Sequence, residues 1–263
     1  MQDFALTLDK FLDHAAKWHP AGGVVSAGAD GATRRIAYPA LRDNAKRVSR
    51  LLANRGLAQG GCVATLAWNS QEHMEAWYGI MGMGAVCHTL NPRLPTDQLA
   101  WMLDRSGAAI LIASADLEDQ ARTIARQVTG PAPEVILLGD GVAPARATLA
   151  EMLQGEDASF EWGAFDERSV SGLCFTSGTT GEPKGVSYTH RANYLHTLRL
   201  LQADVLAITA EDIVMPVVPM FHANAWGLPF ACPAAGATLV MPGRNADGAS
   251  LAALIAAEGV TIA

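Results

Sequence analysis

Strand-like and helix-like segments alternate between residues 62 and 138, and this alternation limits the fold more than any other feature. Buried strands are predicted by short apolar runs at 62–68, 85–90, 108–113 and 134–138. Between them apolar residues recur at helical spacing, and Asn69, three residues before Glu72, is the expected N-cap of the first of these helices. Strands that alternate with helices in this way pair in parallel. The sequence therefore predicts an α/β fold of layered parallel or mixed sheets with flanking helices.

Composition excludes several classes of function. The 263 residues are 50% hydrophobic and 17% charged, as expected of a globular chain. The formal net charge is −7, and Lys and Arg form no cluster that would bind a nucleic acid backbone. The four cysteines lack the spacing of a C-x-x-C pair or a zinc site, which indicates reduced thiols. The N-terminus has neither the basic nor the apolar region of a signal peptide, so we expect a cytoplasmic protein.

The segment 213–243 contains no Asp, Glu, Lys or Arg and is long enough for a transmembrane helix. It is interrupted by Pro216, Pro219, Pro229, Pro233 and Pro242. Because proline breaks helices, this segment predicts a buried strand, turn, helix and strand, and no transmembrane segment.

A region with few long apolar runs, 141–169, divides the chain. We expect two closely packed parts: an N-terminal α/β subdomain over 1–165, and a second subdomain over 166–263. A single large domain is the alternative. In the second part, apolar runs at 212–218 and 237–242 predict strands, and a last helix is expected over 251–257.

The ten residues 176–185, TSGTTGEPKG, combine glycines with hydroxyl side chains and one lysine. They follow a strand-like run, and open α/β sheets bind ligands at the ends of their strands. Glycines let backbone N–H groups approach an anion, and Lys184 adds a positive charge. The string is not a Walker A motif, because Pro183 and Gly185 stand where that motif needs Gly and Ser or Thr. An ordinary surface loop is the alternative, but the length of the ordered string favours a phosphate site.

The longer string FTSGTTGEPKGVSYTH, residues 175–190, resembles the phosphate-binding signature of the acyl-adenylate-forming enzymes. The stretches TLAWNSQEHMEAWYGIMGMGAVCHTLNPRL and PMFHANAWGLPFACPAAGATLVMPG resemble the fatty-acyl-CoA synthetase branch, with its medium-chain, long-chain and methylthiopropionate-type ligases. The resemblance implies a two-step reaction. A carboxylic acid and ATP form acyl-AMP and pyrophosphate, and coenzyme A then displaces AMP to form acyl-CoA. It also implies Mg²⁺, which neutralises phosphate charge.

The same resemblance assigns roles to residues. The expected phosphate-binding residues are Thr176, Ser177, Gly178, Thr179, Thr180, Gly181 and Lys184. Thr176 is also expected to help hold Mg²⁺, and Lys184 and His222 are the expected catalytic residues. His222, Ala223 and Trp226 are expected to contact the acid, with His222 beside its carboxylate and Trp226 deeper, at the mouth of the acyl channel. Packed core residues are the alternative for His222 and Trp226, since an isolated His or Trp is more often packed than catalytic.

Several features of these enzymes have no counterpart in the sequence. They are the glutamate that pairs with Mg²⁺, the aspartate that binds the ribose, and the lysine of the small C-terminal domain. We therefore interpret the chain as the N-terminal half of an acyl-CoA synthetase, inactive alone. The alternative is a non-catalytic nucleotide- or acyl-binding remnant or split subunit that needs a second chain. The missing half and a second copy in a homodimer are the candidate protein partners.

Overall fold

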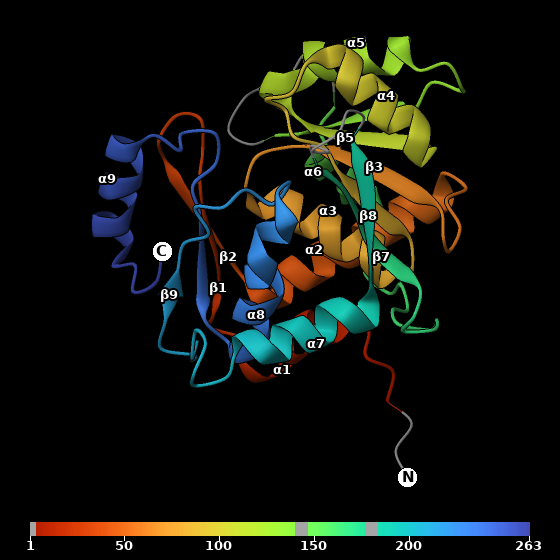
Figure 1. Ribbon diagram of the computed structural model, residues 1–263. Coiled ribbons are helices and arrows are strands. Elements are labelled where there is room, and N and C mark those ends of the chain that lie inside the picture. The colour runs from red at the N-terminus through yellow and green to blue at the C-terminus, as the bar shows by residue number, and fades with distance from the viewer. Residues whose placement is uncertain (1–3, 140–146, 177–182) are drawn as a thin grey trace.

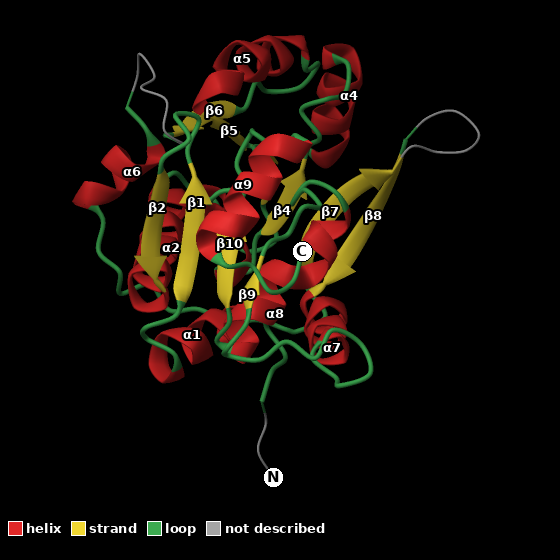
Figure 2. Ribbon diagram, turned by 90° about the vertical axis from the view of Figure 1, so that its left-hand side faces the viewer, coloured by secondary structure: helices red, strands yellow, loops and turns green. Residues whose placement is uncertain are grey.

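The computed structural model describes residues 4–139, 147–176 and 183–263, and these form two sheets with helices between and outside them (Figures 1 and 2). The strands are β1 (Gly23–Ala27), β2 (Thr33–Ala37), β3 (Cys62–Leu66), β4 (Val86–Thr89), β5 (Ile110–Ser114), β6 (Glu134–Leu138), β7 (Val170–Thr176), β8 (Lys184–Thr189), β9 (Ile213–Val214) and β10 (Thr238–Met241). The α-helices are α1 (Asp9–Trp18), α2 (Tyr38–Asn54), α3 (Gln71–Gly82), α4 (Thr96–Ser106), α5 (Glu118–Gln127), α6 (Leu149–Met152), α7 (His190–Leu200), α8 (Leu228–Ala235) and α9 (Gly248–Glu258). Short 3₁₀ helices are η1 (Ala115–Leu117), η2 (Leu153–Gly155) and η3 (Ala223–Gly227).

The larger sheet has six strands in the order β6-β5-β3-β4-β7-β8. All its pairings are parallel except that of β7 with β8, which form an antiparallel hairpin. The smaller sheet has the order β2-β1-β10-β9, with an antiparallel pair at the β2 edge. The prediction of parallel pairing from the alternating pattern is therefore confirmed for β3 to β6, and the fold is the expected layered α/β fold.

Apolar faces explain the order of the layers. The largest core cluster joins both sheets to α1, α2, α3 and α8, so these helices lie between the sheets. Its largest fully buried side chains include Trp77 and Tyr78 of α3 and Phe230 of α8, whose rings contact one another. A second cluster packs α4 and α5 against the outer face of the six-stranded sheet. A third places α9 on the outer face of the smaller sheet.

Both sheets contain strands from each side of residue 165. In the smaller sheet β1 pairs with β10, and in the larger sheet β4 pairs with β7. The division into subdomains 1–165 and 166–263 stays a prediction, and any such subdomains share both sheets.

Two local predictions differ from the structure. The strand expected over 212–218 is confined to β9, and the chain then follows an irregular path through Pro216 and Pro219. The N-cap of α3 is Ser70, whose Oγ accepts a hydrogen bond from the His73 amide at 3.2 Å; the prediction of Asn69 is wrong.

Within the described ranges, every helix is too short or too polar to cross a bilayer, so the apolar segment 213–243 does not form a transmembrane helix.

Candidate functional site

The β7–β8 hairpin carries the ends of the predicted phosphate loop. Thr176 is the last residue of β7 and lies directly opposite Lys184, the first residue of β8. Directly opposed residues of antiparallel strands place their side chains on the same face, so the Thr176 hydroxyl and the exposed Lys184 ammonium share one face of the hairpin. The other predicted phosphate-binding residues lie outside the described residues: Ser177, Gly178, Thr179, Thr180 and Gly181.

The face of the hairpin that carries Thr176 and Lys184 continues along both strands. Side chains alternate in a strand, so Cys174 of β7 and Tyr188 of β8 lie on this same face. Tyr188 is four residues beyond Lys184, which corresponds to roughly 14 Å at about 3.4 Å per residue. The hairpin therefore leads on one face from the loop ends toward Tyr188.

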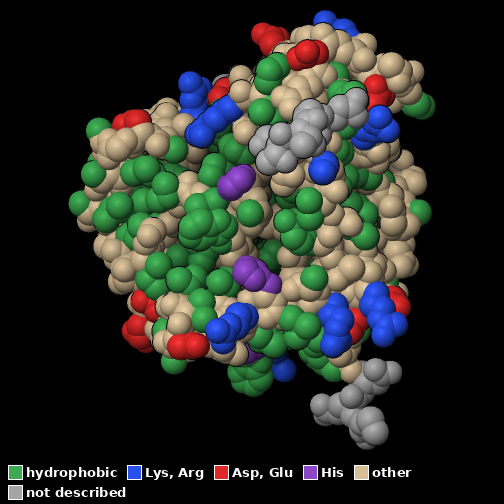
Figure 3. All heavy atoms as spheres, in the orientation of Figure 1, with side chains coloured by type: hydrophobic (Ala, Val, Ile, Leu, Met, Phe, Trp, Pro, Cys, Tyr) green, Lys and Arg blue, Asp and Glu red, His purple; other side chains and the backbone are tan. Residues whose placement is uncertain are grey.

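A pocket of about 370 Å³ opens beside Tyr188. Its lining comes from the hairpin and the following helix on one side, and from η3 on the other. The lining residues are Tyr188, Ala192, Asn193, His196, Ala223, Asn224, Trp226 and Gly227. The pocket thus brings together Ala223 and Trp226, which the sequence singled out, with polar residues of α7 that it did not. On the face shown in Figure 3, hydrophobic side chains gather with exposed histidine side chains among them.

Trp226 lies at the rim of this pocket. The residue is in the lining, but it is 59% exposed. Three residues of the lining, Ala192, Asn193 and His196, belong to α7. This helix begins at the N-cap Thr189, whose Oγ1 accepts a hydrogen bond from the Ala192 amide at 3.1 Å. Asn193 is buried and donates through Nδ2 to Ser171 Oγ at 3.1 Å, which ties the helix to β7.

The backbone of η3 is left-handed. Four consecutive residues, Ala223 to Trp226, have φ angles of 46°, 53°, 47° and 54°, and Gly227 follows at 79°. Non-glycine residues disfavour this region by about 1–2 kcal/mol each, so such a turn persists only where its surroundings hold it. Asn224 makes one of the contacts that hold the turn. It is 4% exposed, and its Oδ1 accepts a hydrogen bond from Cys174 Sγ at 3.5 Å. The turn is therefore anchored to β7, two residues before Thr176.

His222 immediately precedes this turn. Its side chain is exposed, it is not among the residues that line the pocket, and its backbone N–H donates to Pro219 O at 2.9 Å. The carbonyl of His222 accepts a hydrogen bond from the Ala225 amide at 3.1 Å, which closes the left-handed turn. The structure thus places His222 beside the pocket residues Ala223 and Trp226 along the chain, at the entry to the turn.

Asn69 fixes the segment that leads to His222. Its Nδ2 donates to the carbonyls of Pro216 at 3.0 Å and Val218 at 3.1 Å, and its Oδ1 accepts from the Met220 amide at 2.7 Å. These three hydrogen bonds satisfy backbone groups that have no partner in a strand or helix. Buried backbone groups need such partners. Sequence reasoning missed this role. The signal was the position of Asn69 just after β3, at the sheet edge where α/β folds assemble their sites.

The described residues do not by themselves form a metal site. Among them, no group of three or more His, Cys, Asp or Glu side chains converges to hold an ion. Mg²⁺ bound with nucleotides is usually held by one or two carboxylates and the phosphates, whereas Thr176 offers only a hydroxyl oxygen.

Burial lowers the pKa of His73 to about 4 and that of His88 to about 3, so both rings are neutral near pH 7, and both are packed inside the fold.

Comparison with known proteins identifies the family. The family model described as AMP-binding enzyme matches residues 12–263. The chain belongs to the AMP-binding enzyme family. Similar proteins include a 3-methylmercaptopropionyl-CoA ligase of Ruegeria pomeroyi, 40% identical over 98% of this chain and 49% of the relative. A medium-chain-fatty-acid–CoA ligase of Ectopseudomonas oleovorans is 38% identical over 98% of this chain and 48% of the relative. The chain thus spans about half the length of these relatives, as the sequence resemblance implied.

Solved structures agree with the fold. The N-terminal domain of FACL13 from Mycobacterium tuberculosis superposes with a TM-score of 0.82 at 26% identity, over 97% of this chain and 61% of that chain. The anthranilate CoA ligase AuaEII, solved with anthranoyl-AMP, superposes with a TM-score of 0.86 at 20% identity, over 99% of this chain and 48% of that chain. The second likeness shows the fold alone. The predicted α/β fold and the predicted family are both confirmed.

Proposed function

We propose that this AMP-binding family chain contributes the phosphate hairpin and the acid pocket of an acyl-CoA synthetase. The observation that carries this proposal is that Thr176 and Lys184 share one hairpin face with Tyr188, which lines the pocket at the other end of β8. An acid in the pocket and the phosphates of ATP at the loop would meet along this face. The α-phosphate would lie between them, where the carboxylate must attack.

The proposed chemistry has two steps. A carboxylate oxygen attacks the α-phosphorus of ATP, the bond to the β-phosphate breaks, and pyrophosphate leaves. The thiol of coenzyme A then loses its proton and attacks the acyl carbon, and AMP leaves. Lys184 and the loop from Thr176 to Gly181 would bind the leaving phosphates, which stabilises charge that develops in the first transition state.

On the acid side, His222, Ala223 and Trp226 are the proposed contacts, with His222 nearest the carboxylate and Trp226 controlling entry of the acyl chain. The exposure of Trp226 at the pocket rim supports its role at the entrance. Mg²⁺ is proposed with Thr176 as one oxygen ligand, and its remaining protein ligand would come from outside the described residues. The four cysteines are free, which supports a reducing compartment, the cytoplasm.

Lys184 provides the direct test. In isothermal titration of this chain with ATP and Mg²⁺, Lys184→Ala should weaken binding about tenfold or more, because a charge-assisted hydrogen bond contributes about 1.5–3 kcal/mol. Lys17→Ala, an exposed lysine on α1, is the matched control and should bind ATP as the original chain does. Equal affinities for the Lys184→Ala and control variants would refute the phosphate-binding role. Binding of ATP and acid by a chain that never forms acyl-AMP, even with a complementing second half, would instead support the binding-remnant alternative.

A further inference from the structure

The left-handed turn over Ala223–Trp226 lacks an explanation in its own sequence. Alanine and tryptophan disfavour positive φ, and only Asn224 and Gly227 are residues that adopt it readily. The turn nevertheless forms one wall of the pocket. Contacts from neighbouring elements must therefore hold it, and their position shows which part of the turn each one controls.

Asn224 anchors the first half of the turn. Its side chain reaches β7, where Cys174 Sγ donates to it, and it lies over Gly172, at which an added Cβ would be 3.8 Å from Asn224 Nδ2. Cys174 Sγ also contacts Thr89 Oγ1 at 3.1 Å, so this anchor is continuous with β4. It does not reach the second half of the turn, where Trp226 lies.

His196 of α7 contacts that second half. Its Nε2 lies 3.2 Å from the Trp226 carbonyl oxygen. Since a carbonyl only accepts, Nε2 must carry the proton. The ring also lies against Gly227, where an added Cβ would be 3.0 Å from His196 Cδ2 and 3.3 Å from Nε2. Gly227 is thus required both by its φ of 79° and by the close approach of the imidazole.

His196 itself stands on a firmly held helix. The neighbouring residue Thr197 is buried, and its Oγ1 donates to Asn193 O at 2.8 Å, while Asn193 bonds to Ser171 of β7. A side chain on a helix held in this way can impose a position on a strained loop. Both His196 and Trp226 line the pocket, so a change in their contact changes the shape of the pocket.

We propose that His196 is a positioning residue: its Nε2–H hydrogen bond to the Trp226 carbonyl holds the left-handed turn and fixes the indole at the pocket rim. The effect on ligands rests on the proposed function, in which this pocket binds the acid. His196 then determines which acids the pocket accepts, and it leaves the phosphate end of the hairpin unchanged, because it contacts Trp226 and Gly227, whereas Thr176 and Lys184 are not in the lining of the pocket.

The first experiment needs no ligand. The chain is labelled with 5-fluorotryptophan, and the ¹⁹F resonance of Trp226 among the six tryptophans is assigned with Trp226→Phe. His196→Leu removes the donor and should shift or split this resonance. His196→Gln keeps an N–H at a similar reach and should retain it, whereas His196→Asn is polar but too short and should behave as His196→Leu. His14→Leu, an exposed histidine on α1, is the control and should change nothing.

The second experiment uses octanoate and 3-methylmercaptopropionate as probes, with ATP titrated separately. His196→Leu and His196→Asn should lower acid affinity about tenfold and change ATP affinity less than twofold, and His196→Gln should restore acid binding. An unchanged Trp226 resonance in both His196→Leu and His196→Asn would overturn the proposal, as would equal losses of acid and ATP affinity. The original chain could also bind neither acid while His196→Leu and His196→Asn still shift the Trp226 resonance. That result would support the hydrogen bond to the turn and overturn the acid-binding function instead. His196→Asn and His196→Gln keep the test decisive where His196→Leu fails to fold.

Discussion

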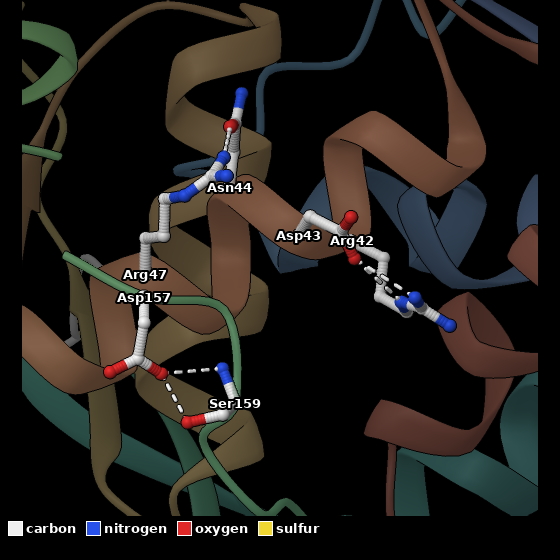
Figure 4. A network of polar contacts seen from close by, with 6 residues as sticks. All are labelled: Arg42, Asp43, Asn44, Arg47, Asp157 and Ser159. Atoms are coloured by element: carbon white, nitrogen blue, oxygen red, sulfur yellow. Dashed lines mark hydrogen bonds and ion pairs between the residues drawn. The ribbon is translucent and has the colours of Figure 1, made fainter. Parts of the chain in front are cut away.

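Glu75 is a carboxyl group in the closely packed interface of α2 and α3, only 3% exposed. Its Oε1 accepts hydrogen bonds from Asn44 Nδ2 and Gln71 Nε2, both at 2.9 Å. Figure 4 shows Arg47 directed at the same Asn44, whose Oδ1 it contacts at 2.8 Å. Burial raises the pKa of Glu75 to about 7, an effect that nearby Glu72 reinforces and that the two amides and Arg47 oppose. The protonated acid is therefore the form that the fold favours.

Glu75→Gln should make folding less sensitive to pH. Between its ordinary pKa of 4.5 and about 7, the folded chain keeps a proton that the unfolded chain has lost. The contribution of Glu75 to the free energy of unfolding is therefore fully present below pH 4.5. It is lost as pH rises through 7, at about 1.4 kcal/mol per pH unit. In urea unfolding we expect the variant to be more stable than the original chain at pH 8, by about 1–3 kcal/mol, with a smaller difference at pH 5.

The buried histidines do not confuse this comparison. Burial lowers the pKa of His73, His88 and His190, so their contributions to the free energy of unfolding are lost as pH falls below 6.5. These contributions are the same in the original chain and in Glu75→Gln. Glu211→Gln removes an exposed carboxylate and serves as the matched control. The same pH dependence in the original chain and Glu75→Gln would contradict the assignment of a protonated Glu75.

At the scale of elements, the β7–β8 hairpin is braced on the face opposite Thr176 and Lys184. The Phe175 ring packs against His88 of β4 and Trp101 of α4, with ring centroids 5.2 Å and 5.9 Å apart. It also covers Gly185 on the paired strand, where an added Cβ would be 3.4 Å from its Cε1 and Cζ. Phe175 and Gly185 are the chain neighbours of Thr176 and Lys184, so this packing sets the position of both loop ends.

Gly185→Val should therefore weaken ATP binding without unfolding the chain. The new methyl groups displace the Phe175 ring, and overpacking of this kind costs typically about 1–3 kcal/mol. Part of this strain should move Thr176, so we expect about tenfold weaker binding of ATP by calorimetry, with the folded circular dichroism spectrum retained. Ser187→Val, on the same face of β8 but two residues farther from the loop, is the control and should bind ATP normally. Normal ATP affinity in Gly185→Val would show that the brace does not position the loop.

At the scale of the whole molecule, the chain spans about half the length of the curated relatives it matches. We expect residues 1–263 alone to form no acyl-CoA. Catalytic groups that act as a unit lose nearly all rate when some are absent, and residues 1–263 contain no counterpart of the magnesium-binding glutamate, ribose-binding aspartate and C-terminal lysine that the resemblance to acyl-adenylate-forming enzymes implies. The assay supplies ATP, Mg²⁺, coenzyme A and fatty acids of short to long chain, and measures AMP and acyl-CoA. Sustained turnover above that of Lys184→Ala and His222→Ala would show that residues 1–263 are sufficient.

The parts of the fold that the sequence predicted are those whose cause is local. Burial of one face leaves an apolar period in each segment, so the strands from β3 to β6 and the helices between them were predictable from a few residues each. The prediction of a phosphate site in the glycine-rich string also rests on local features, because an anion site needs small residues and donors close together in the chain, and it stays a prediction. Thr176 and Lys184 of that string lie opposite each other as a hairpin requires.

Only the tertiary structure decided how distant segments use one another's polar groups. Asn69 has the local pattern of an N-cap, but it bonds to Met220, 151 residues away, because the packing of the two sheets brings an unpaired backbone beside it. The sequence motif predicted Trp226 as an acid contact, and this role stays a prediction; the left-handed turn that carries Trp226 is contacted by His196 of α7 and, through Asn224, by Cys174 of β7, which share no motif with it. Burial of Glu75 likewise follows from the approach of α2 to α3. Such contacts leave no period in the sequence, since their energy arises from groups that become neighbours only after the layers assemble.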